Sequence, residues 1–369
     1  MEQMILQDIC KVYDCPHTTA KDEGIGIPLV RTPNIGKGRL LLTNAHRVNS
    51  DIYQERTRRA IPEEDDIIIA REAPVGNAAI IQMGQKVCLG QRVVLLKPIR
   101  DRVDPNYLVY YLLSDEIQHR LRIHANGAVV AHLNMADIRN LPVSLPSLSE
   151  QKKIGRVLKI IDDKIELNRR INDNLEQQAQ ALFKSWFVEN ASYSGVSISE
   201  YFLPNRGKNL LVSDAKGGIT PVVAGGLTPS AFHNVANTKA PVITISASGA
   251  NAGFVNLWGI PVWAADSSYI DSTIVSNIYF WYNLLKYNQK NIYESQTGSA
   301  QPHIYPKHIG NLLIPDLDMR KVECYESIVT SMYLQINEIQ QETKFLSDLR
   351  DTLLPKLMSG ELKINDLNC

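Results

Sequence analysis

The sequence predicts a mixed α+β protein in which one unit, a globular domain followed by a long helix, is used twice. Two observations predict this fold. Two segments of the chain resemble each other at a constant offset in residue number, and each is followed by a long apolar seven-residue pattern. Self-similarity at a fixed offset is the mark of a repeated architecture. A unit duplicated in this way predicts a frame with pseudo-twofold symmetry.

The repeat is carried by short matching segments. Without any gap, Gly127-Ala128, His132 and Ile138-x-Asn140-Leu141 match Gly298-Ser299, His303 and Ile309-x-Asn311-Leu312. Upstream, Gly76-Asn77-Ala78-Ala79 resembles Ala250-Asn251-Ala252-Gly253 at a slightly different offset. The change in offset predicts a small difference in length between the two globular halves. The paired histidines suggest a shared structural hydrogen bond, because a catalytic histidine is seldom needed twice in one chain.

The first long helix is expected to begin at Ser149, whose hydroxyl can cap it, and to run for about 40 residues, or about 60 Å. Its apolar residues alternate at spacings of four and three, which is the a/d seam of a heptad repeat. Asn168 and Asn172 interrupt the seam, and polar seam residues fix the register of paired helices. The first seam consists of Ile154, Leu158, Ile161, Ile165, Asn168, Asn172, Leu175, Ala179, Leu182 and Trp186.

The second long helix repeats this register at the same offset that relates the globular segments. One apolar seam cannot remain in water, so we expect the two helices to pack against each other. The alternative is that each is an ordinary long core helix. The second seam consists of Tyr325, Val329, Met332, Ile336, Ile339, Thr343, Leu346, Arg350, Leu353 and Leu357.

The globular halves show mixed secondary-structure signals and many turns. In the first half, residues 66–70 and 93–96 are typical of buried strands, and 105–122 of a helix capped by Asp104. In the second half, residues 241–245 and 253–255 predict strands, and 276–287 a helix. The predicted boundaries are a first domain at 1–146, a helix at 147–190, a second domain at 191–318, and a helix with a tail at 319–369.

Composition excludes several classes of protein. The 369 residues suffice for two or three domains, and 44% apolar residues support real cores. Lys plus Arg equals Asp plus Glu, at 39 each, so the basic excess of a non-specific nucleic-acid binder is absent. Base-specific reading stays open, because specificity comes from base contacts. Five cysteines without a CxxC pair fit a reducing cytoplasm, and we expect no secretory signal and no membrane span.

No catalytic motif in the sequence is convincing. Asp104-Pro105-Asn106-Tyr107 resembles the Asp-Pro-Pro-Tyr motif of amino-methyltransferases, but its third residue differs, and a helix cap is the preferred interpretation. Gly24-Ile25-Gly26 and Gly36-Lys37-Gly38 lack the spacing of a phosphate loop and are typical of turns. The eight histidines show no metal-ligand spacing. We therefore expect no catalytic residue, no metal and no cofactor in this chain.

Three segments along the first helix identify a family. They are 145–154 (LPSLSEQKKI), 162–172 (DDKIELNRRIN) and 181–187 (ALFKSWF), and together they closely resemble the central conserved region of specificity subunits of type I restriction–modification systems. Residues 349–362 (LRDTLLPKLMSGEL) resemble the distal conserved region of the same family. Residues 241–258 resemble one of its target-recognition domains, so the resemblance spans nearly the whole chain.

The resemblance implies a non-catalytic protein. Two target-recognition domains would each read half of a bipartite site in double-stranded DNA, and an antiparallel coiled coil would set their spacing. Two methylation subunits, which bind S-adenosylmethionine, would dock on this frame, as would restriction subunits in the full complex. Three alternatives remain at this point: a reader in a methylation-only system, a purely structural coiled-coil scaffold, and an enzyme with an unrecognised site.

Candidate DNA contacts come from chemistry alone, since Arg and Lys pair with guanine, Asn and Gln with adenine, and Ser with either. The cluster Arg56, Arg58 and Arg59 could equally be a solvated face, and turn geometry is the favoured role of Asn77 and Asn251. The candidates are Arg31, Lys37, Arg39, Arg47, Arg56, Arg58, Arg59, Arg71 and Arg92 in the first domain, and Lys208, Lys216, Lys239, Ser246, Ser248, Asn251, Gln301 and His303 in the second.

Overall fold

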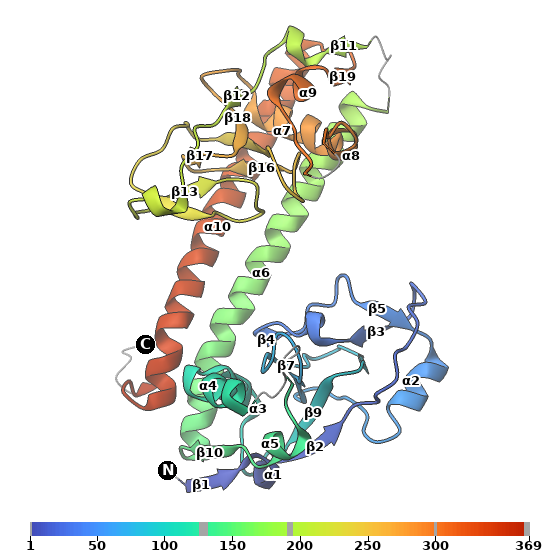
Figure 1. Ribbon diagram of the computed structural model, residues 1–369, viewed down its shortest axis with the longest axis vertical. Coiled ribbons are helices and arrows are strands. Elements are labelled where there is room, and N and C mark those ends of the chain that lie inside the picture. Colours follow the sequence, from blue (N-terminus) through green and yellow to red (C-terminus); the bar gives the residue numbers. More distant parts are fainter. Residues whose placement is uncertain (1, 125–131, 190–194, 299–300, 365–369) are drawn as a thin grey trace. The chain divides into compact units, whose positions relative to one another are not determined.

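The computed structural model describes residues 2–124, 132–189, 195–298 and 301–364 (Figure 1). The chain forms two compact units, which we call unit 1 (residues 1–165 and 345–369) and unit 2 (residues 166–344). Two long helices, α6 (Leu148–Phe187) and α10 (Met319–Ser359), each contribute one part to each unit. Within the described ranges, no helix is long and apolar enough to cross a membrane.

The described residues of unit 1 form three sheets. Its strands are β1 (Glu2–Ile5), β2 (Cys10–Asp14), β3 (Ile27–Val30), β4 (Gly38–Arg39), β5 (His46–Val48), β6 (Ile67–Ala70), β7 (Ala78–Ile80), β8 (Cys88–Leu89), β9 (Val93–Pro98) and β10 (Pro142–Leu145). The largest sheet has the order β2-β9-β6-β7-β4, the second β5-β3-β8, and the third β1-β10. The strands predicted at 66–70 and 93–96 are the central β6 and β9, which are buried because apolar clusters cover both faces of this sheet.

Unit 2 repeats this arrangement. Its strands are β11 (Val196–Ser197), β12 (Asn205–Arg206), β13 (Thr220–Val223), β14 (Ala231–His233), β15 (Val242–Ser246), β16 (Val255–Trp258), β17 (Trp263–Ala264), β18 (Ser267–Asp271) and β19 (Leu313–Ile314). They form sheets of order β12-β18-β15-β16, β14-β13-β17 and β11-β19. The strand predicted at 253–255 is displaced: Gly253 has a positive φ of 87° in a turn, and the strand begins only at Val255.

The pairing of the strands shows that the repeat extends to topology. In unit 1, β6 is antiparallel to both β7 and β9, and in unit 2, β15 is antiparallel to both β16 and β18. In the smaller sheets, β3 is antiparallel to β5 and parallel to β8, while β13 is antiparallel to β14 and parallel to β17. The predicted mixed α+β repeat is therefore confirmed. Of the residues that suggested it, Gly127, Ala128 and Ser299 lie outside the described residues.

Short helices complete each unit. They are α1 (Leu6–Ile9), α2 (Ser50–Arg56), α3 (Pro105–Leu113), α4 (Asp115–His124) and α5 (Met135–Arg139) in unit 1, and α7 (Ile278–Tyr287), α8 (Gln289–Glu294) and α9 (Pro306–Gly310) in unit 2, with 3-10 turns at Thr32–Asn34, Ile198–Glu200 and Val212–Asp214. Asp104 caps α3 as predicted, because its carboxylate accepts the Tyr107 backbone N–H at 2.9 Å. The single helix predicted at 105–122 is wrong in one respect. Ser114 has an extended backbone and separates α3 from α4.

The first long helix also begins slightly earlier than predicted. Its cap is Ser147 and not Ser149, because the Ser147 hydroxyl accepts the Glu150 backbone N–H at 3.4 Å. The Glu150 carboxylate accepts the Ser147 backbone N–H in return, at 3.1 Å. This reciprocal capping box places Ser149 inside the first turn.

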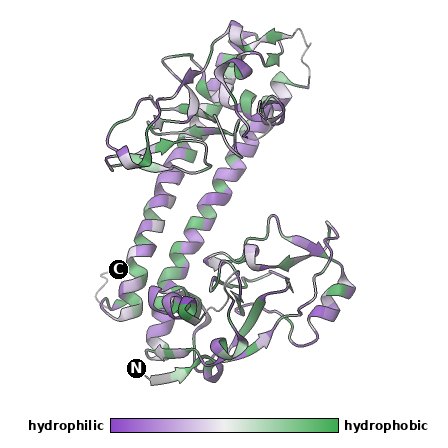
Figure 2. Ribbon diagram, in the orientation of Figure 1, coloured by the Kyte–Doolittle hydropathy of each residue, from purple (hydrophilic) through white to green (hydrophobic). Residues whose placement is uncertain are grey.

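In each unit, one part of α6 packs antiparallel against one part of α10. The N-terminal part of α6 contacts the C-terminal part of α10 in unit 1, where Ile154 and Leu158 are buried with Leu357. The C-terminal part of α6 contacts the N-terminal part of α10 in unit 2, where Phe183 is buried with Tyr325. Figure 2 shows hydrophilic and hydrophobic residues alternating along both helices. The antiparallel coiled coil is thus confirmed.

All the predicted seam residues are buried or half-buried. Asn168 is completely buried, and its side-chain amide donates to the Glu342 carboxylate of α10 at 2.8 Å. A buried amide that finds its partner in only one alignment favours one register.

Candidate nucleic-acid interface

In unit 2, the turn that follows β15 lies against the segment that precedes α9. The Gly249 backbone N–H donates to the Pro302 carbonyl at 3.1 Å, and the Ile304 N–H donates to the Ala247 carbonyl at 2.9 Å. A β-bridge also joins Ser248 to His303. The fold thus brings together predicted DNA contacts from two separate segments of the chain, namely Ser246, Ser248, Asn251, Gln301 and His303.

These five side chains differ in what they offer to a ligand. Gln301 is exposed, and His303 is half-buried with its ring stacked on Tyr305. The Ser248 hydroxyl donates to Asp266, and the Asn251 amide donates to the Gly225 carbonyl at 3.4 Å. Ser246 is only 4% exposed. We call the turn after β15, together with the segment that precedes α9, the face of unit 2. Gln301 and His303 are the accessible side chains of this face, while Asn251 holds the loop that contains Gly225.

The three predicted lysines of unit 2 are exposed and anchored through their backbones. The Lys208 N–H donates to the Ala264 carbonyl at 2.9 Å, and the Lys216 N–H donates to Nδ1 of His233 at 3.1 Å. The Lys239 N–H donates to the Asp271 carboxylate at 2.8 Å. Lys208 and Lys216 thus lie beside the β14-β13-β17 sheet with their charged ends in solvent.

Unit 1 has an equivalent face, in which the turn after β6 lies against the segment around Leu133. The Leu133 N–H donates to the Arg71 carbonyl at 2.9 Å, which corresponds to the bond between Ile304 and Ala247 in unit 2. The Asn77 amide donates to the Ile35 carbonyl at 3.0 Å, as the Asn251 amide does to Gly225. The Arg71 guanidinium is occupied, because Nε donates to the Leu133 carbonyl and Nη1 to Asp14, each at 2.9 Å. Arg71 therefore links the end of β2, at Asp14, to the segment around Leu133 and has a structural role in this face.

A tight hairpin at residues 35–40 lies beside this face. The Gly36 N–H donates to the Arg39 carbonyl at 3.0 Å, and Ile35 forms a β-bridge with Leu40. Lys37 is exposed at the tip. Gly38 has a φ of 87°, a conformation that a residue with a Cβ rarely adopts. The glycines thus serve as turn residues, as predicted, and they present one lysine.

Five of the other predicted arginines of unit 1 fall into two groups. Arg58, Arg59 and Arg92 are exposed, although Arg92 pairs with Glu72 at 2.9 Å and Arg59 Nη1 lies 3.4 Å from the Asp14 carbonyl. The half-buried group comprises Arg31, whose Nε is enclosed, and Arg47, which donates to the Gly26 carbonyl at 3.2 Å.

Arg56 belongs to neither group. It is 6% exposed, with Nε donating to the Leu89 carbonyl at 2.8 Å and Nη1 to the Thr18 carbonyl at 2.9 Å. A guanidinium held in this way cannot reach DNA without abandoning buried carbonyls, which costs free energy. We assign Arg56 a structural role and leave it, with the buried Ser246, outside the DNA-contact surface proposed below.

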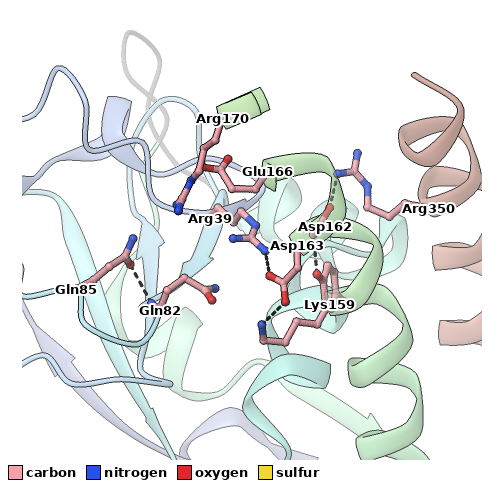
Figure 3. Close-up of polar contacts among 10 residues, drawn as sticks. Arg39, Gln82, Gln85, Lys159, Asp162, Asp163, Glu166, Arg170 and Arg350 are labelled. Carbon is pink, nitrogen blue, oxygen red and sulfur yellow. Dashed lines mark hydrogen bonds and ion pairs between the residues drawn. The ribbon is translucent and has the colours of Figure 1, made fainter. Parts of the chain in front are cut away.

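Sequence reasoning missed a cluster of charged residues where the globular part of unit 1 meets the coiled coil (Figure 3). Asp162 of α6 accepts the Tyr110 hydroxyl at 2.7 Å and Arg350 Nη1 at 2.8 Å. The next residue, Asp163, accepts Arg39 and also Lys159, the latter at 2.5 Å. Two signals pointed to the cluster, namely adjacent carboxylates in a seam helix and Arg350 at a seam position of the other.

The charges of this cluster stabilise one another. Burial raises the pKa of Asp163, but the hydrogen bonds from Lys159 and Arg39 outweigh it and hold the pKa below its ordinary value. Burial lowers the pKa of Arg350, but Asp162 and Asp351 outweigh it and raise the pKa above its ordinary value. Asp163 and Arg350 are therefore ionised at neutral pH.

We call the place where the globular part of a unit packs against the coiled coil its joint. The joint of unit 2 is formed mostly by neutral side chains. The Tyr333 hydroxyl donates to Asn283 Oδ1 at 2.9 Å, and the Gln180 amide donates to the same atom at 2.8 Å. The Tyr282 hydroxyl donates to Glu176 at 2.5 Å. Glu326 of α10 accepts the Phe280 N–H at 2.7 Å and so caps α7, while burial raises the pKa of Glu326.

Comparison with known proteins agrees with this architecture. The family model of the type I restriction modification DNA specificity domain matches residues 1–177. The MjaIX specificity subunit of a type I restriction enzyme from Methanocaldococcus jannaschii is 25% identical, over 87% of this chain and 82% of its own length. A putative type I specificity subunit from Mycoplasma pneumoniae is 24% identical, over 74% of this chain and 76% of its own length.

A solved structure shares the fold. The S subunit of a type I restriction–modification system from M. genitalium superimposes with a TM-score of 0.62 at 20% identity, covering 96% of this chain and 95% of that one. Duplicated units, a shared coiled coil and these relatives lead to one conclusion. The chain belongs to the specificity subunits of type I restriction–modification systems.

Proposed function

We propose that this chain selects the DNA target of its complex and carries no catalytic residues of its own. Unit 1 and unit 2 each bind one half of a bipartite site in double-stranded DNA. The observation that carries the proposal is the repeated face after β6 and β15. In both units, a turn is tied to a following segment by a backbone hydrogen bond, and an asparagine ties it to a glycine-containing loop. Base reading needs side chains held on a rigid support.

The two faces carry different chemistry, which supports an asymmetric target. Unit 1 presents Lys37, Arg58 and Arg59 to solvent, and arginine and lysine suit guanine and phosphate. Unit 2 presents Gln301 and His303 with flanking lysines, and glutamine suits adenine. We propose that the two half-sites differ in sequence for this reason.

The coiled coil is proposed to act as spacer and docking frame. The 40-residue α6 and the 41-residue α10 both belong to the two units, so their length limits the spacer between half-sites. Equivalent stretches of the paired helices offer two similar docking surfaces, which suits two methylation subunits that bind S-adenosylmethionine. Restriction subunits would join the same frame in the complete complex. The relatives named above as specificity subunits support this assignment.

The test is methylation mapping. The chain is co-expressed with the methylation subunits of its own system in a host without other adenine methyltransferases, and the genome is sequenced with a method that detects methylated adenine. We expect one bipartite motif with a fixed internal spacer. A one-part motif would contradict two readers, and methylation that does not change when the chain is omitted would contradict the specificity role and favour a scaffold.

A further inference from the structure

We propose that Arg39 is a positioning residue that ties the hairpin at 35–40 to the coiled coil through Asp163, so that the position of α6 controls where Lys37 meets DNA. The inference rests on the proposed function, because it assumes that unit 1 binds one half-site. It replaces the direct DNA contact that the sequence suggested for Arg39. It also makes Asp163, whose negative charge the phosphates of DNA would repel, a determinant of DNA affinity.

The hairpin is held at its base and exposed at its tip. Its second arm is β4, the edge strand of the five-stranded sheet, where Gly38 pairs with Ala79 of β7 and Arg39 with Ile80. Its first arm is held by the Asn77 amide, which donates to the Ile35 carbonyl. Lys37 lies between these anchors and is exposed.

The hairpin lies directly against α6. A Cβ built on Gly38 would be 3.5 Å from the Asp162 carboxylate and 3.8 Å from the Tyr110 ring, which is ordinary contact distance. One residue later, Arg39 Nη2 pairs with the Asp163 carboxylate. Figure 3 shows Arg39 and Lys159 converging on Asp163, while Arg350 reaches the adjacent Asp162. The hairpin, α6 and α10 therefore meet at two neighbouring carboxylates.

The guanidinium of Arg39 is committed to this contact. Its side chain is 21% exposed, whereas Lys37 is open to solvent. A phosphate would have to displace a carboxylate that Arg39 already neutralises, so the pair offers little net charge to DNA. Arg39 consequently acts on DNA through the placement of Lys37.

Among the described residues of unit 2, no ion pair matches the one between Arg39 and Asp163. Its glycine loop is held by Asn251, as the hairpin of unit 1 is held by Asn77. However, the residue that corresponds to Asp163 in the repeat is Leu334, an apolar side chain that is 52% exposed. Leu334 cannot accept a hydrogen bond from an arginine. The coupling is therefore a property of the first half-site alone.

The test is a double-mutant cycle on the complete methylation complex, with binding measured on DNA that carries both half-sites. We expect Arg39→Ala and Asp163→Ala to weaken binding by a similar factor, about three- to tenfold, and the double variant to be no worse than either one. The reversed pair Arg39→Asp with Asp163→Arg should recover part of the affinity. DNA in which the first half-site is scrambled should bind all variants equally.

Salt dependence separates positioning from direct contact. Removing a phosphate contact lowers the slope of log affinity against log salt by about one, so Lys37→Ala should lower it. Arg39→Ala should leave the slope unchanged. If Arg39→Ala lowers the slope while Asp163→Ala preserves or strengthens binding, Arg39 contacts phosphate and the inference is overturned.

Two control variants show whether a loss of DNA binding reflects misfolding of the chain. Arg120→Ala removes an exposed ion pair with Glu116 in the same unit, at 2.7 Å, and should not change DNA binding. Asp163→Asn keeps the shape of the side chain and should reproduce the effect of Asp163→Ala more weakly. A wild-type complex without any site-specific binding would defeat the proposed function itself, whereas additive losses in a complex that binds would defeat only the coupling.

Discussion

The two units solve the same packing problem with different chemistry. In unit 1, α3 meets the coiled coil through Tyr110, which donates to Asp162, and Asp162 in turn pairs with Arg350. In unit 2, α7 meets it through Asn283, which accepts the hydroxyl of Tyr333. Asp162 and Tyr333 are related by the offset of the repeat and so occupy equivalent positions. The backbone arrangement is kept, while donor and acceptor have changed places.

This difference determines how strongly a single substitution should destabilise each joint. The side chain of Asp162 is only 6% exposed, so its charge depends on Arg350 for compensation. Asn283 Oδ1 accepts from both Tyr333 and Gln180, so it keeps one donor when the other is removed. The joint of unit 1 should therefore be sensitive to single substitutions, and that of unit 2 tolerant.

The largest effect is expected from Arg350→Met. This variant keeps most of the side-chain volume but leaves Asp162 buried without its cation, which typically costs about 3–5 kcal/mol of unfolding free energy. Chemical denaturation of the chain measures it. Asp162→Asn combined with Arg350→Met should recover much of the loss, since the uncompensated charge is gone. A loss under about 1 kcal/mol for Arg350→Met would show that the joint of unit 1 is not a desolvated ion pair.

The faces of unit 1 and unit 2 that we propose to bind DNA should each respond to a different substitution. Arg58→Ala should weaken binding through the first half-site and Gln301→Ala through the second, each by about 1–3 kcal/mol if the side chain contacts a base, which is about 5- to 150-fold in affinity. Competition with DNA scrambled in one half-site measures each loss separately. Arg120→Ala, which removes a cation from the exposed side of α4, serves as the control. Equal losses on both half-sites from one substitution would argue against independent readers.

The sequence predicts the two long helices better than it predicts the side chains proposed to contact DNA. The heptad spacing is local information, so it predicts both long helices and their pairing from residues such as Leu158 and Val329. Ser114 ends α3 where the apolar run at 107–113 gives way to Asp115 and Glu116, and the helical periodicity alone does not reveal this break. The sequence prediction of a cap at Ser149 is wrong although a signal for Ser147 is present, because Glu150 lies three residues after Ser147, which is the spacing of a capping box.

The faces are harder to predict because the role of a side chain depends on distant partners. Arg56 and Arg58 are close neighbours in sequence, yet one is buried among carbonyls and the other is exposed. The partner of Arg39 lies far away in sequence, on α6. Nothing in the neighbouring sequence distinguishes an arginine that faces solvent from one that turns inward. Choosing candidates by positive charge alone therefore includes both exposed arginines, which can contact DNA, and buried arginines, which have a structural role.

The smallest effect is expected from Tyr333→Phe, which tests the tolerant joint. The ring stays packed against Tyr279, with centroids 4.8 Å apart, and Asn283 Oδ1 keeps the Gln180 donor. Only one neutral hydrogen bond is lost, so unfolding free energy should fall by about 0.5–1.5 kcal/mol. Tyr325→Phe is the matched control, because its hydroxyl donates at 2.9 Å to the Ala179 carbonyl on the same pair of helices. A loss at Tyr333 as large as that of Arg350→Met would mean that the neutral network acts as one cooperative unit, and the contrast between the two joints would disappear.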